Sequence, residues 1–181
     1  MNMDIGSAAL VVIDVQQKLA PAMSDFETCA NRIELLLDGA RELGLDTLVT
    51  EQYPKGLGPT LPRFASRLPA GQVYLPKTGF SVFADPGFRT ALSQKSRKTL
   101  IFCGIESHVC VLQSVFDALE RGFAVALAAD AVTSRKAADC ELALAAARAA
   151  GATVLSAEAL LFMLLGDAKH PAFKAISKLV R

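Results

Sequence analysis

The chain has 181 residues, of which 52% are hydrophobic and 20% charged, with a formal net charge of +1. This length and composition predict one soluble globular domain over 1–181 and argue against a disordered chain. The absence of a basic, aromatic-rich patch argues against nucleic acid as a partner, and the apolar runs are too short to span a membrane.

Short apolar runs recur along the chain, and their Val, Leu and Ile content is typical of strands buried on both faces. They end, in chain order, at Asp14, Thr50–Glu51, Pro76–Lys77, Gly104, Asp130 and Ser156. Helical patterns lie between them at about 26–43, 86–96, 107–121 and 138–150. This alternation predicts an α/β fold with a parallel sheet covered by helices on both sides.

Two segments interrupt the alternation. Residues 52–71 are rich in proline and glycine, which is typical either of a lid or pocket wall or of a plain connection. In the tail, 166–181, Pro171 is placed to begin a short helix. The apolar stripe of that helix consists of Phe173, Ile176, Leu179 and Val180. We expect this stripe to dock either on its own domain or on a neighbouring subunit of a homo-oligomer.

The four cysteines, at positions 29, 103, 110 and 140, are scattered and lack CxxC spacing. This pattern predicts a reduced, cytoplasmic protein without a disulfide framework or a zinc ribbon. No Lys or Arg precedes the first apolar run, so we expect no signal peptide. With no GxGxxG motif and only two distant histidines, the sequence predicts neither a dinucleotide cofactor nor a histidine-rich metal site.

Three reactive residue types follow predicted strands. In open α/β sheets, ligands bind beyond the carboxyl ends of the strands. Asp14, Lys77 and the step from Gly104 to Cys110 follow the first, third and fourth strands. We therefore expect a carboxylate, an ammonium and a thiol to meet at one edge of the sheet.

Cys110 is the candidate nucleophile. If Ser107 caps the following helix, Cys110 is its third residue, and a helix N-terminus favours the thiolate. Each of the three residues also has a structural interpretation. Cys110 could be a small buried hydrophobic residue, Asp14 could cap a helix or bond a loop, and Lys77 could be a solvated surface residue. His108 lies two positions from Cys110, and residues at this spacing do not face each other on a helix.

Three motifs resemble the isochorismatase-like superfamily of cysteine hydrolases: VVIDVQ with Asp14, LPKTGFSVF with Lys77 and GIESHVCV with Cys110. TEQYPKGLG and PAFKAISKL are similar to its isochorismatase domain-containing branch. The resemblance implies a three-layer α/β/α, Rossmann-like fold with a six-stranded parallel sheet in the order 3-2-1-4-5-6. It also implies an Asp–Lys–Cys triad on these three residues and a cis peptide bond at Ile105–Glu106.

The departures from the superfamily narrow the expected chemistry. Nicotinamidases carry a metal site with histidines after the second strand, and the matching stretch from Val49 to Gly58 has none. Enzymes that cleave isochorismate itself generally lack the cysteine. The sequence therefore predicts a metal-independent, cofactor-free cysteine hydrolase that cleaves a C–N bond of a small amide-type molecule.

In this hypothesis Cys110 attacks the carbonyl carbon, Asp14 moves the proton and Lys77 offsets the repulsion between carboxylate and thiolate. The backbone N–H groups of Val109 and Cys110, next to Ile105–Glu106, are the candidate oxyanion donors. The candidate pocket residues are Gln16, Glu51, Tyr53, Phe80 and Phe83. The alternative is a non-hydrolytic protein that keeps the fold and uses Cys110 for redox sensing or binding.

Overall fold

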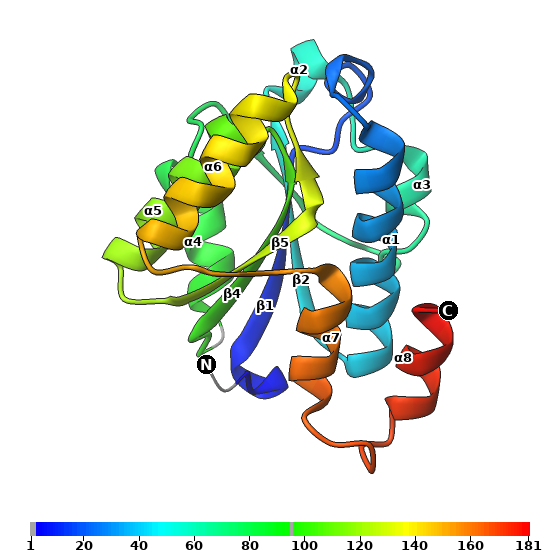
Figure 1. The fold of residues 1–181 in the computed structure, drawn as a ribbon. Coiled ribbons are helices and arrows are strands. Elements are labelled where there is room, and N and C mark those ends of the chain that lie inside the picture. Colours follow the sequence, from blue (N-terminus) through cyan, green and yellow to red (C-terminus); the bar gives the residue numbers. More distant parts are fainter. Residues whose placement is uncertain (1–2, 95) are drawn as a thin grey trace.

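The computed structural model describes residues 3–94 and 96–181 of the chain (Figure 1). One six-stranded sheet forms the centre, in the order β3-β2-β1-β4-β5-β6, and each pair of neighbouring strands is parallel. Its strands are β1 Ala8–Ile13, β2 Asp46–Gln52, β3 Tyr74–Lys77, β4 Thr99–Ile105, β5 Ala124–Thr133 and β6 Thr153–Leu155. The predicted fold class and strand order are confirmed.

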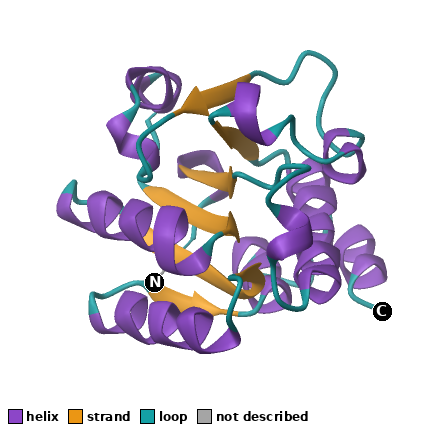
Figure 2. Ribbon diagram, turned by 90° about the horizontal axis from the view of Figure 1, so that it is seen from above, coloured by secondary structure: helices purple, strands orange, loops and turns teal. Residues whose placement is uncertain are grey.

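Helices cover both faces of the sheet, as Figure 2 shows from above. One face carries α1 Phe26–Leu43, α3 Pro62–Ala65, α7 Ala157–Leu165 and α8 Phe173–Leu179, and the other carries α4 Pro86–Ser93, α5 Leu112–Glu120 and α6 Ala137–Ala149. The short α2 Pro54–Leu57 follows the carboxyl end of β2, at the top of Figure 1. None of the helices in the described part of the chain has the length and apolar character needed to cross a bilayer.

The sheet separates two hydrophobic cores, and β1 contributes to both. All six residues of β1 are buried. Leu10 and Val12 pack in the core beneath α1 and α7, whereas Val11 and Ile13 pack in the core beneath α4 and α5. This alternation follows from the two-residue period of a strand, and a strand buried on both faces has to be apolar throughout.

The boundaries of some elements differ from those that the sequence predicts. β5 continues past Asp130 to Thr133, where it pairs with the end of β4. The Asp130 carboxylate accepts a hydrogen bond from the Ala157 N–H at 2.7 Å, at the beginning of α7. The sequence did not single out α7, although Ser156 caps it by accepting from the N–H of Ala159. Because α7 is apolar nearly all round, its sequence lacks the amphipathic period that marks a surface helix.

The tail docks on its own domain. α8 contacts α1 and α7, and Ile176 is fully buried there, while Phe173 stacks edge-on against Phe162. Of the two alternatives for the apolar stripe, the structure therefore shows the intramolecular one. The stripe no longer supplies a reason for a homo-oligomer, which stays a prediction.

Candidate active site

Asp14 follows the last residue of β1 and is completely buried. Its φ of +53° turns the chain sharply, in a region that Asp visits more readily than most residues. The hydroxyl of Thr50 on β2 donates to its Oδ1 at 2.8 Å. Oδ2 lies 2.6 Å from Lys77 Nζ but has no aligned hydrogen bond among the described residues. Oδ2 is therefore the carboxylate oxygen that is open to a proton.

Lys77 ends β3 and brings its ammonium group into the same buried space. Besides Asp14, Nζ contacts Gln52 Oε1 at 2.6 Å and the carbonyl oxygens of Phe80 and Gly79 at 3.0 and 3.3 Å. An ammonium group has three hydrogens, so these acceptors use all of its donor capacity. The alternative of a solvated surface lysine is wrong, because the short β3 and the following loop fold over the side chain.

Cys110 lies in a wide helical turn, Ser107–Val111, that connects β4 to α5. Only 7% of the residue is exposed, and its carbonyl accepts from the Ser114 hydroxyl at 2.6 Å. The prediction that Ser107 caps this helix is wrong. Glu106 occupies the capping position, and the Ser107 hydroxyl instead bonds that of Ser134, because the carboxyl end of β5 reaches this turn.

The three groups influence one another electrostatically. Burial raises the pKa of Asp14 above its ordinary 3.8, although Lys77, Thr50 and Cys110 oppose the rise. Burial, and after it the Asp14 charge, raise the pKa of Cys110 to about 12, although Lys77 opposes the rise. Burial therefore opposes the thiolate form that the helix start was expected to favour. Burial thus favours the neutral thiol of Cys110, next to the Asp14–Lys77 pair.

The backbone around Cys110 agrees in part with the sequence prediction. The Ile105–Glu106 peptide bond is cis, as the resemblance implied. The N–H of Val109 donates to the Glu106 carbonyl at 3.1 Å, so it is occupied in the resting structure. Of the two candidate oxyanion donors, the N–H of Cys110 is the one without such a bond to Glu106, and its role stays a prediction.

Comparison with known proteins identifies the family to which this site belongs. Residues 8–159 match the family model described as the isochorismatase domain. The chain belongs to the isochorismatase family. A relative from Bos taurus named isochorismatase domain-containing protein 2 is 38% identical over 177 residues, which cover 97% of this chain and 84% of the relative.

Two solved structures extend the likeness to three dimensions. The MAR1 ribonuclease of Caenorhabditis elegans is 38% identical, with a TM-score of 0.94 and coverage of 99% of this chain and 92% of that one. The protein YcaC of Pseudomonas aeruginosa, solved with hexane-2,5-diol and covalent acrylamide, is 28% identical, with a TM-score of 0.90 and coverage of 98% and 91%. Membership of the isochorismatase family supports a hydrolase for this chain.

Two of the predicted pocket residues in this isochorismatase-family chain make internal hydrogen bonds. Gln16 is fully buried; its Nε2 donates to the carbonyls of Gln52 and Gly58 at 3.0 and 2.6 Å, and its Oε1 accepts from the Gln52 N–H at 2.7 Å. Glu51 Oε1 accepts from both the N–H and the hydroxyl of Thr60 at 2.7 and 2.8 Å. Both side chains hold the segment after β2 in place, and contact with a substrate stays a prediction for them.

The three aromatic candidates fall into two environments. Phe83 is buried, with ring centroids 5.3 and 5.9 Å from those of Phe88 and Phe123, so it packs in the core beneath α4 and α5. Tyr53 and Phe80 are more than half exposed. Both have backbone bonds to Lys77: the Tyr53 N–H donates to the Lys77 carbonyl at 2.9 Å, and the Phe80 carbonyl accepts from Nζ. Tyr53 and Phe80 are therefore the better placed to meet a substrate.

Sequence reasoning missed Thr50 and Gln52, which contact Asp14 and Lys77 directly. The signal was present in the sequence, because residues at i and i+2 of a strand share a face. Thr50 and Gln52 end β2 on one face, while Glu51 between them points to Thr60. Polar residues at alternate positions near the carboxyl end of a strand are the pattern that would have found them.

His108 does not join the Asp14–Lys77–Cys110 cluster. Its Nδ1 lies 2.9 Å from the Ser134 hydroxyl and its Nε2 lies 4.0 Å from Asp139. These contacts agree with the sequence argument that His108 and Cys110 face different ways. Within the described part of the chain, no three His, Cys, Asp or Glu side chains gather in a way that could hold a metal ion.

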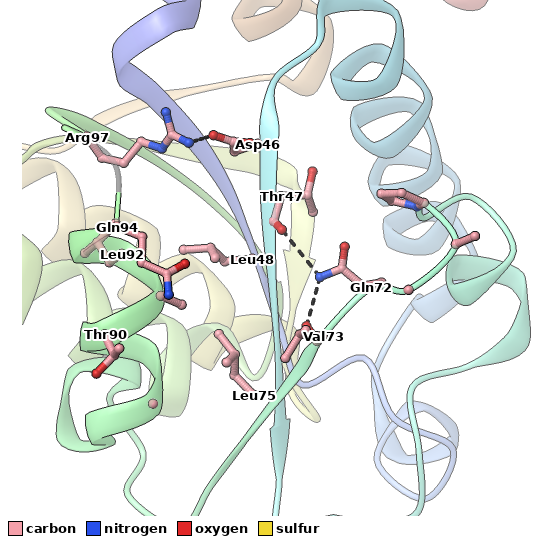
Figure 3. Close-up of a pocket in the computed structure, with 15 residues that line it drawn as sticks. Asp46, Thr47, Leu48, Gln72, Val73, Leu75, Thr90, Leu92, Gln94 and Arg97 are labelled. Carbon is pink, nitrogen blue, oxygen red and sulfur yellow. Dashed lines mark hydrogen bonds and ion pairs between the residues drawn. The ribbon is translucent and has the colours of Figure 1, made fainter.

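A cavity of about 780 Å³ lies at the opposite, amino-terminal edge of the sheet (Figure 3). It is lined by the start of β2, the segment before β3 and part of α4, where Arg97 pairs with Asp46 and the Gln72 amide points toward the Thr47 carbonyl. None of its described lining residues is a cysteine, serine or histidine. Its size alone does not make it the reactive site, because the Asp14–Lys77–Cys110 cluster lies at the other edge of the sheet.

Proposed function

We propose that the chain is a cysteine hydrolase that cleaves a C–N bond of a small amide-type molecule without a metal ion. The observation that carries the proposal is the buried cluster at the carboxyl edge of the sheet. There the Asp14 carboxylate lies 2.6 Å from the Lys77 ammonium, and both charges act on the pKa of the Cys110 thiol. A nucleophile, a base and a cation thus share one largely dry space, as covalent acyl transfer requires.

The raised pKa values suggest how the first step proceeds. A thiol with a pKa of about 12 is not a standing thiolate at neutral pH, so its proton leaves as the sulfur attacks. Asp14 takes that proton, and burial improves it as a base by bringing its pKa closer to working pH. The sulfur bonds to the carbonyl carbon, and the N–H of Cys110 is the proposed donor to the oxyanion.

The remaining steps return the site to its starting state. The C–N bond breaks when Asp14 passes its proton to the leaving amine, which leaves an acyl thioester on Cys110. Asp14 then takes a proton from water as the water oxygen attacks the thioester, and the proton returns to the sulfur as the acid departs. The Lys77 ammonium stabilises each anionic stage from a fixed position, since its hydrogens are bound to fixed acceptors.

Two of the similar proteins bear on this proposal. The covalent acrylamide in YcaC of Pseudomonas aeruginosa supports a reactive group in a protein of this fold. The Caenorhabditis elegans protein is named a ribonuclease. For this chain we favour the small-molecule reaction, because the Lys77 ammonium is buried and fully bonded rather than open to a phosphate.

Redox sensing by Cys110 is the alternative. Sensor cysteines are accessible and have low pKa values. Cys110 has a raised pKa and is only 7% exposed, so the geometry favours the hydrolase. Mild peroxide that oxidises Cys110 faster than a substrate analogue acylates it would favour the sensor instead.

Amine release from a panel of small amides, ureides and carbamates tests the proposal. We expect turnover by the wild-type chain and by Cys140→Ser, a matched control because Cys140 is half-buried and lies outside the cluster. We expect none by Cys110→Ser, and no loss of turnover after dialysis against a chelator. Turnover that survives Cys110→Ser, or cleavage of RNA with no amide cleaved, would overturn the proposal.

A further inference from the structure

Gln52, the last residue of β2, contacts the one cation of the Asp14–Lys77–Cys110 cluster. Its side-chain oxygen accepts from Lys77 Nζ at 2.6 Å, the same distance that separates Nζ from Asp14 Oδ2. The other acceptors at Nζ are backbone carbonyls of the loop after β3. Among the described residues, Gln52 is thus the one neutral side chain that binds this ammonium.

Gln52 is itself fixed on every side. Its amide nitrogen donates to the Thr78 carbonyl at 2.8 Å, which defines the orientation of the amide and turns Oε1 toward Lys77. Its backbone N–H and carbonyl both bond the side chain of the buried Gln16. A side chain held at both ends in this way offers its oxygen at a defined place instead of following the lysine.

The charge of residue 52 matters as much as its shape. Lys77 lowers the pKa of the Cys110 thiol, and Asp14 raises it. A neutral acceptor holds the ammonium without adding a negative charge next to the thiol. A carboxylate at the same place would pair with Lys77 and weaken the effect of its charge on Asp14 and Cys110.

We propose that Gln52 is a positioning residue for the hydrolase reaction: its neutral side-chain oxygen holds the Lys77 ammonium next to Asp14, where its charge acts on Cys110. This inference rests on the proposed function, because it assigns Lys77 an electrostatic task during attack by Cys110. It also gives a role to the half-buried polar side chain at the end of β2.

Two variants separate the loss of the acceptor that positions Lys77 from the effect of a negative charge at residue 52. Gln52→Met keeps the length of the side chain but removes the acceptor, and Gln52→Glu keeps an acceptor but adds a charge. The control is Gln72→Met, which removes the same atoms from a half-buried glutamine whose amide donates to the Val73 and Thr47 carbonyls at the other edge of the sheet. All variants carry Cys140→Ser, so that the more exposed thiol does not react.

The measurement is the rate of iodoacetamide labelling of Cys110 between about pH 7 and 9, where a thiol with a higher pKa reacts in proportion to its thiolate fraction. We expect Gln52→Met to be labelled about tenfold more slowly at each pH, which corresponds to one pKa unit, and Gln52→Glu more slowly still. We expect Gln72→Met to follow the wild type. Amide turnover should fall in the same order.

Labelling rates of both Gln52 variants that coincide with those of Gln72→Met would overturn the inference, even if both variants were less stable. If Gln52→Met does not fold, the labelling rate of Cys110 in Gln52→Glu, compared with that of the wild type, decides alone. Labelling requires no substrate, so its outcome is independent of whether Cys110→Ser abolishes amide turnover. The failure of the positioning role and the failure of the hydrolase proposal are therefore distinguishable.

Discussion

Lys77 Nζ lies 2.6 Å from Asp14 Oδ2, and both side chains are almost completely buried. Lys77 ends β3, and Asp14 directly follows β1. These two strands are not neighbours, so the pair spans β2 and passes the Thr50 and Gln52 side chains. Removing two charges from water is expensive, and the attraction between them offsets that cost only if further hydrogen bonds complete the site. Thr50 and Gln52 supply those bonds from the strand in between.

A double-mutant cycle should reveal this dependence. We expect Lys77→Met to lower the free energy of unfolding by about 3–5 kcal/mol, because it leaves the Asp14 carboxyl buried without its cation. Asp14→Asn should also destabilise the chain, since it leaves the ammonium without its anion. The double variant should be more stable than the sum of the single losses predicts. Urea unfolding at neutral pH measures all three, and additive losses would show that the two charges do not interact.

The same pair should control the reactivity of Cys110. Asp14 raises the pKa of the thiol and Lys77 lowers it. We therefore expect Asp14→Asn to speed labelling of Cys110 by iodoacetamide and Lys77→Met to slow it, while neither variant turns over substrate. Mass mapping after brief labelling across a pH series makes the comparison. Identical profiles for the wild type and both variants would show that neither charge acts on the thiol.

The pKa of Asp14 predicts the acid side of the activity profile. As the pH falls through that pKa, the carboxylate gains a proton and can no longer take one from Cys110. Because burial raises the pKa above 3.8, turnover should begin to fall at a higher pH than an ordinary aspartate would give. The dependence of kcat/KM on pH measures the midpoint of this loss. A midpoint at or below 3.8 would contradict the assignment of Asp14 as the base.

The convergence of Asp14, Lys77 and Cys110 was predictable from sequence because each follows a strand of a parallel sheet, and all such strands end at one edge. That argument uses only the direction of the backbone. It does not give the direction of side chains, and Thr50 and Gln52 were missed for that reason. Phe83, also a candidate for the pocket, packs in the same core as Cys110, and contact with a substrate stays a prediction for it.

The protonation state of Cys110 was beyond sequence reasoning for a different reason. The position of a residue near a helix start is visible in the sequence, but the burial that follows from packing is not. Here burial is the largest effect on the thiol, and it raises the pKa. The Ser107–Ser134 contact was hidden likewise, since it depends on β5 continuing beyond Asp130.

Gly104 connects the sheet to the Cys110 turn and should not tolerate a side chain. Its φ is +114°, and a Cβ built there would lie 2.1 Å from the Ile13 carbonyl oxygen of the neighbouring strand. We expect Gly104→Ala to cost at least about 3 kcal/mol, from strain and from displacement of β1. The control is Gly122→Ala, where φ is +81° but nothing lies within 4 Å, and the cost should be about 1–2 kcal/mol. Thermal unfolding of both variants tests this, and equal losses would contradict the clash.

The last prediction concerns the contribution of the docked helix α8 to stability. Ile176 of α8 is fully buried against its own domain, so Ile176→Ala should lower the free energy of unfolding by about 2–5 kcal/mol. Because α8 packs on α1 and α7, amide turnover per folded molecule should not change.

Light scattering completes this test. We predict a homo-oligomer, with a mass in solution that is a multiple of 19.2 kDa. The stripe of α8 is already covered within one chain, so Ile176→Ala should leave that mass unchanged in the folded protein. Lys174→Ala, at an exposed position of the same helix, serves as the control and should alter neither stability nor mass. A drop to 19.2 kDa in Ile176→Ala alone would show that α8 contributes to an interface after all.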